Sequence, residues 1–133
     1  MEFFRIVNIQ TNEKKIQSKL TLENLDLISN DIFSVESKDD SEAKIGCGWG
    51  EFTLTRFEIR GGLRFALVEC PNALAWTITT GFAPKPEAIV LHLTINRKTQ
   101  SKTFIDEIEA FLDDQSDCLQ SFDKALGKFI LSI

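Results

Sequence analysis

The hydrophobic period of the chain changes once, near Asn96, and this change constrains the fold more than any other feature. Before it, Ile89, Leu91, Leu93 and Ile95 alternate with other residues, which is typical of a β-strand. After it, apolar residues recur every three or four positions, which predicts helix. Strands followed by helix, rather than strands alternating with helices, favour the α+β class.

Two stripes of apolar residues predict helix in the C-terminal part of the chain. The first comprises Phe104, Ile105, Ile108, Phe111 and Leu112, and the second comprises Cys118, Leu119, Phe122, Ala125, Leu126, Phe129 and Ile130. Ser101 or Thr103 can cap the N-terminus of the first stripe. Because the stripes are nearly in phase, one long helix through Gln115 and two helices, the second capped by Ser116, are both compatible with the pattern.

The dipeptide Gly61-Gly62 predicts a hairpin between two segments rich in strand-forming residues. A three-residue loop is expected because it pairs Ile59 with Phe65, whereas a two-residue Gly-Gly loop would pair Ile59 with Arg64. Strands are expected at residues 32–35, 51–60, 63–70, 74–78 and 89–95, and loops at residues 37–42 and 81–86.

Residues 3–22 predict a second hairpin, in which a polar turn brings Ile9 opposite Ile16. In this interpretation Thr21 caps a short helix that ends near Asn30. The competing interpretation makes residues 13–29 a helix, because Ile16, Leu20 and Leu27 also roughly fit a helical stripe.

Length and charge bound the class of protein. The chain has 133 residues, the size of one domain, and its 15 Lys and Arg against 20 Asp and Glu give a net charge of −5. We expect a single α+β domain over residues 1–133, with an antiparallel sheet of about five to seven strands and one or two C-terminal helices packed on one face. The acidic balance argues against nucleic-acid binding.

The sequence contains no secretory signal and no apolar run long enough to span a membrane, so we expect no membrane association. Its three cysteines are widely spaced and form no C-x-x-C pair. We therefore expect reduced thiols in a cytoplasmic protein. A single histidine excludes multi-histidine metal sites, and no acidic cluster matches a calcium loop, so neither a metal nor another cofactor is expected.

The candidate catalytic residues are few. His92 could serve as a general base if Cys47 or Cys70 lay within hydrogen-bond reach. The competing interpretation places His92 on the less buried face of its strand and treats the cysteines as small core residues. The second interpretation is favoured.

Three groups of residues are candidates for contact with a partner. Trp49, within a glycine-rich string, is either a packing anchor or an exposed contact. Arg56, Arg60 and Arg64 are expected on one face near the hairpin turn, either solvated or in contact with an acidic partner. A negative helix face, either solvated or steering a basic partner, is expected from Asp106, Glu109, Asp113, Asp114 and Asp117.

These observations favour a non-enzymatic, acidic intracellular protein that binds and masks a partner protein, of the inhibitor, toxin-immunity or secretion-chaperone kind. One alternative is a domain that binds a small apolar ligand beneath a sheet closed by the C-terminal helix. The other is a Cys/His-dependent enzyme. The sequence leaves the partner and the oligomeric state open.

Overall fold

The computed structural model describes the backbone of residues 1–131 and the side chains of residues 1–121. Its seven strands form one antiparallel sheet in the order β1-β7-β6-β5-β4-β3-β2. The strands are β1 (Glu2–Val7), β2 (Phe33–Asp39), β3 (Glu42–Cys47), β4 (Gly50–Ile59), β5 (Gly62–Leu67), β6 (Ala75–Thr80) and β7 (Ile89–Thr94). The helices are α1 (Glu13–Lys19), a short 3-10 helix η1 (Leu25–Leu27) and α2 (Lys102–Leu131). This arrangement confirms the predicted α+β class.

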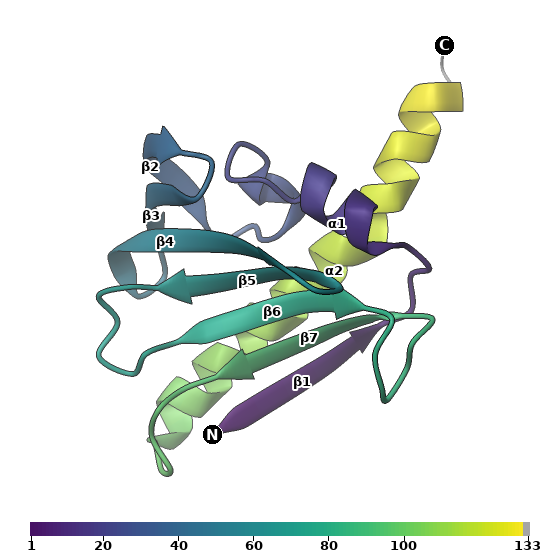
Figure 1. Cartoon of the computed structure of the whole chain (residues 1–133). Coiled ribbons are helices and arrows are strands. Elements are labelled where there is room, and N and C mark those ends of the chain that lie inside the picture. Colours follow the sequence, from purple (N-terminus) through teal and green to yellow (C-terminus); the bar gives the residue numbers. More distant parts are fainter. Residues whose placement is uncertain (132–133) are drawn as a thin grey trace.

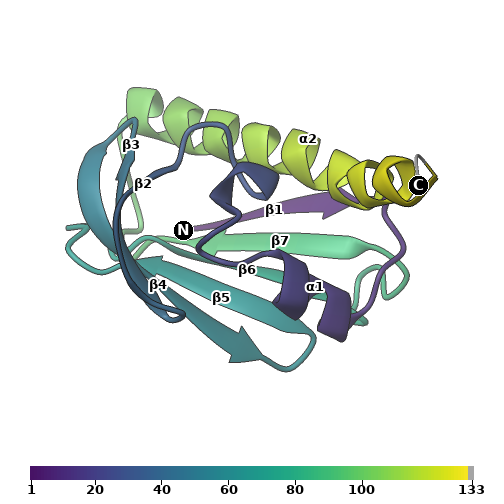
Figure 2. The same ribbon diagram turned by 90° about the horizontal axis from the view of Figure 1, so that it is seen from above.

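Both helices and η1 pack on the same side of the sheet, which we call the inner face. Figure 1 looks onto the opposite side, the outer face, with α2 crossing behind the strands. Figure 2, turned by 90°, shows α2 running along one side of the sheet. Within the described part of the chain, no helix covers the outer face, and none is long and apolar enough to cross a membrane.

The C-terminal part forms one helix rather than two. The Oγ of Ser101 accepts a hydrogen bond from the backbone N–H of Phe104 at 3.2 Å, so the predicted cap at Ser101 is confirmed. Ile108, Leu112 and Leu119 are buried against the sheet. The second predicted stripe lies outside the described side chains from residue 122 onward.

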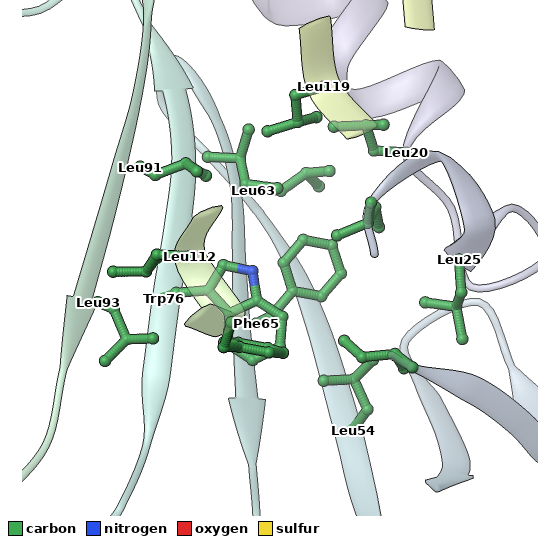
Figure 3. Packing of buried hydrophobic residues seen from close by; sticks show 14 of the residues in the cluster. Leu20, Leu25, Leu54, Leu63, Phe65, Trp76, Leu91, Leu93, Leu112 and Leu119 are labelled. Carbon is green, nitrogen blue, oxygen red and sulfur yellow. The ribbon is translucent and has the colours of Figure 1, made fainter. Parts of the chain in front are cut away.

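The core lies between the inner face and α2, and aromatic rings fill its centre (Figure 3). Phe65 stacks on Trp76 with ring centroids 5.3 Å apart, and Phe111 of α2 meets Trp76 edge-on at 5.3 Å. Leu112 and Leu93 lie beside Trp76 in the close view. Burying each such side chain contributes about 1.5–3 kcal/mol, so this layer accounts for why the helix stays on the sheet.

The N-terminal hairpin prediction is wrong, and the competing helix over residues 13–29 is found only in its first part, Glu13–Lys19. Strand β1 pairs with β7 rather than with its neighbour in sequence. The Oδ1 of Asn12 accepts a hydrogen bond from the N–H of Lys15 at 2.9 Å and so caps α1. Ile16 and Leu20, four residues apart, are both buried. The helix ends at Lys19, and η1 is the only helical turn within residues 21–30.

The predicted register of the central hairpin is also wrong. Ile59 pairs with Gly62, so Arg60 and Gly61 form the turn. Gly61 adopts φ +88°, a conformation that glycine enters without steric cost. In this register Phe57 lies opposite the exposed Arg64. The even-numbered residues of β4 therefore point to the inner face. The physical reason is that a charged residue, Arg56, finds partners on the inner face.

The predicted loop at residues 37–42 is mostly strand. Strand β2 continues to Asp39 and β3 begins at Glu42, which leaves a turn of two residues. Every residue of β2 is exposed, and β2 lies at one edge of the sheet. Polar residues are tolerated in such a strand, so their presence did not mark a loop. The loop predicted at residues 81–86 is confirmed between β6 and β7.

Candidate partner-binding surface

His92 lies on the outer face of β7 and does not meet a thiol. Its ring stacks on that of Phe4, with centroids 4.3 Å apart and planes 2° from parallel. Its Nε2 lies 3.0 Å from the Oε1 of Glu2, and within residues 1–121 it is hydrogen-bonded to neither Cys47 nor Cys70. Cys47 continues the inner side of β3, so the sheet separates it from His92. Burial raises the pKa of the Cys47 thiol, which disfavours the reactive thiolate.

Trp49 lies in the β3–β4 turn and packs against α2. Its ring contacts those of Phe104 and Phe111, at centroid distances of 5.7 Å and 5.2 Å. Its Nε1 donates a hydrogen bond to the Oε2 of Glu107 at 2.9 Å. Since the indole is half-buried and its one donor is used, this placement favours the packing interpretation over an exposed contact.

Two of the five candidate carboxylates of α2 pair with Arg5 on β1. The Nε of Arg5 donates to the Oδ1 of Asp113 at 2.9 Å, and its Nη2 donates to Glu109. The hydrogen bond to Glu109 is the main cause of a raised pKa at Arg5. Arg5 points inward from β1, so this ion pair holds α2 to the edge of the sheet.

Asp114 holds the same helix to the loop before β2. It accepts hydrogen bonds from the Oγ of Ser29 at 2.6 Å and from the backbone N–H and side-chain amide of Asn30, both at 3.0 Å. Asp106 and Asp117 stay exposed, and Asp106 lies 4.0 Å from Lys102. Much of the predicted acidic face therefore serves intramolecular contacts, which leaves it less able to steer a partner.

The three candidate arginines do not share a face. Arg56 opposes the buried Phe65, whereas Arg64 opposes Phe57 on the outer face. Arg56 is 8% exposed, and its Nε donates to the carbonyl of Leu20 at 2.9 Å. Its Nη2 donates to another carbonyl at the C-terminus of α1, which is where a cation is favourable. Burial lowers the pKa of Arg56. Arg60 is exposed in the hairpin turn.

A hollow of about 520 Å³ lies between α1, the β2–β3 turn and β4. Carboxylates converge on it from Glu23, Asp39, Asp40 and Glu58. Arg56 also lines it, and this guanidinium donates to carbonyls of α1. None of the lining side chains is both buried and left without a hydrogen bond, so the hollow shows no group that requires a ligand.

Four side chains carry buried polar atoms that have no hydrogen-bond partner among the described residues: Thr11, Trp76, Gln115 and Ser116. Gln115 of α2 is 0% exposed, and neither its Oε1 nor its Nε2 is paired. The Nε1 of Trp76, which is 1% exposed, is likewise unpaired. A buried amide without a partner costs about 1–3 kcal/mol in proteins, so the interior carries an unmet hydrogen-bonding demand.

The outer face carries large apolar side chains whose exposure the sequence did not predict. Phe4 is 53% exposed, Ile6 44%, Phe57 51% and Val68 58%. Phe57 was missed because the expected hairpin, which pairs Ile59 with Phe65, places the odd-numbered residues of that segment on the core side. The turn at Gly61 sets the register that sends Phe57 outward, whereas the pairing of β1 with β7 places Phe4 and Ile6 on the outer face.

One row of directly opposed residues crosses the outer face. From β4 to β1 it runs Phe57, Arg64, Thr77, His92 and Phe4. With strands about 4.8 Å apart, the two phenylalanines stand about 19 Å from each other. Uncharged residues flank the row, including Thr55, Ala66, Thr79 and Val90. Glu2 flanks Phe4 at one end of the row, and Glu42 and Lys44 of β3 lie on the same face. The outer face is therefore broad and combines apolar side chains with charges of both signs.

Comparison of the sequence with models of protein families and with curated proteins finds no match. The function is therefore inferred from the geometry of the chain itself.

Proposed function

We propose that this chain is a non-enzymatic protein that binds and masks a partner protein, and that the partner docks on the outer face of the sheet. The observation that carries the proposal is the exposure of Phe4, Ile6, Phe57 and Val68 on a face that no described helix covers. Polar residues of the row separate Phe57 from Phe4, so the apolar side chains are spread over one face, and a partner that covers the face would remove them from water together.

The composition of the face supports a protein partner. Aromatic residues and arginine are enriched in the centres of protein interfaces, and the row across the outer face contains Phe4, Phe57 and Arg64. Covering a half-exposed phenylalanine contributes about 25 cal/mol to the free energy of binding for each Å² of apolar surface removed from water. Inhibitors, toxin-immunity proteins and secretion chaperones all act by such covering of a partner.

Site-specific cross-linking in the cells that make the protein tests this proposal. A photoreactive phenylalanine analogue replaces Phe57 in one variant and Lys102, whose side chain is 92% exposed on α2, in the matched control. We expect a discrete protein adduct from position 57 and none from position 102. Equal adducts at both positions, or none at position 57, would contradict docking on the outer face.

A second candidate is binding of a small molecule between the sheet and α2, favoured by the unpaired amide of Gln115. A ligand with one carbonyl or hydroxyl group would satisfy that amide, and its apolar part would lie among the core residues. Native mass spectrometry of the protein purified from its own cells tests this. Retention of a small molecule by the wild type, and its loss in Gln115→Leu, is the expected result, and an unliganded wild-type mass would remove the candidate.

A further inference from the structure

We infer that the partner presents an acidic side chain to Arg64, set within an apolar surface that covers Phe57 and Phe4. This inference rests on the proposed function and adds the chemistry of the partner. Its starting observation is the position of Arg64 in the row across the outer face, directly between Phe57 and Thr77.

No described side chain serves as a counter-ion for Arg64. Among residues 1–121, the ion pairs involve other residues, and no hydrogen bond joins Arg64 to a carboxylate. Its cross-strand neighbours are an aromatic ring and a hydroxyl, and its neighbours along β5 on that face are Gly62 and Ala66. Water is therefore the acceptor for its guanidinium when the chain is alone.

A partner that covers this face must replace that water. Phe57 lies one strand spacing from Arg64, about 5 Å, and Phe4 lies three spacings away, about 14 Å, so a surface that covers both rings also covers Arg64. A buried charge without a partner is strongly unfavourable. A carboxylate matches the guanidinium fork with two parallel hydrogen bonds, which makes it the acceptor that best compensates the lost hydration.

A second copy of the chain does not supply that acceptor from this row. If two rows stack in the same order, Arg64 meets Arg64. If they stack in reversed order about Thr77, Arg64 meets His92, and Phe57 meets Phe4. Both arrangements leave the guanidinium facing another basic group. Glu2 lies beside that His92, but its Oε1 already lies 3.0 Å from the Nε2 of the ring. The row therefore offers Arg64 no carboxylate that is not already engaged, and we take a different protein as the partner.

Selection from a displayed library of random dodecapeptides tests the inference, because such a library offers acidic, basic and apolar surfaces to the same face. The wild type, Arg64→Glu and the control Arg60→Glu are each used as the target. Arg60 lies exposed in the adjacent turn, so the control makes the same change of charge off the row. Phe57→Ser is the fourth target, and circular dichroism verifies that every variant folds.

We expect peptides selected on the wild type to combine apolar residues with Asp or Glu. Arg64→Glu should weaken their binding at least about tenfold and select Lys or Arg instead, because it removes a charge-assisted hydrogen bond and sets two carboxylates against each other. Arg60→Glu should change the affinity for these peptides less than threefold. If Phe57→Ser abolishes the binding of the selected peptides and Arg64→Glu leaves it unchanged, the inference of an acidic partner is overturned, whereas docking on the outer face still holds. If Phe57→Ser does not change the binding, or if no peptide binds, both the acidic partner and docking on the outer face are overturned. A dimer of the free chain with Phe57 buried would also overturn the inference, because the partner would then be a second copy of the chain.

Discussion

Replacing the buried amide of Gln115 by a hydrocarbon should stabilise the protein. Gln115 is 0% exposed on the side of α2 that faces the sheet, and neither of its polar atoms has a partner in the described part of the chain. Leucine has nearly the same helix propensity and a similar volume, so Gln115→Leu removes the unpaired amide without creating a cavity. The cost removed is about 1–3 kcal/mol. The free energy of unfolding should therefore rise by about that amount.

Urea denaturation followed by tryptophan fluorescence measures the change, and the melting temperature should rise by about 4 °C for each kcal/mol. Gln120→Leu is the matched control, because Gln120 is exposed on the same helix and its replacement should change the stability by less than about 0.5 kcal/mol. A loss of stability in Gln115→Leu would refute the reasoning. It would mean that the amide is paired in solution, by water or by a bound molecule in the core.

Three further outcomes follow from local geometry. Gly62→Ala should lower the free energy of unfolding by about 3 kcal/mol in chemical denaturation, because its Cβ would lie 1.9 Å from the backbone carbonyl oxygen of Ile78. Hydrogen bonds from Thr53 lower the pKa of Glu69 below its usual 4.5, so its stabilisation exists above that pH and is lost as the pH falls through the lowered pKa. Glu69→Gln should therefore flatten the loss of stability below pH 4.5 in acid titration. Iodoacetamide should label Cys47 more slowly in the folded protein than in urea, measured by mass spectrometry, because burial raises the pKa of its thiol.

The fold was largely predictable where one period ran without interruption. The alternation in residues 89–95 predicted β7, and the stripe that begins at Phe104 predicted α2 with its cap at Ser101. The prediction for residues 13–20 was wrong because Ile16 and Leu20, the two apolar residues that decide between strand and helix, fit both patterns equally well. Residues 37–39 were predicted as loop rather than as part of β2, because an edge strand can consist of polar residues and needs no buried side.

The candidate surface was less predictable than the fold. Arg64 was singled out from the sequence, but its neighbours were not, because a one-residue change of register moves every side chain to the other face. The carboxylates of α2 were expected to face outward. Glu109 and Asp113 instead bind Arg5, which lies more than a hundred residues away in sequence, and no local pattern contains that pairing.

By itself, the sequence determined the class of the fold, since hydrophobic period decides which residues form strand and which form helix. It also determined the absence of a multi-histidine site, because the chain has one histidine. The tertiary structure decided which face each residue occupies. Strand order and register follow from packing across the whole sheet, so only the assembled chain places Phe4, Arg64 and Phe57 on one uncovered surface.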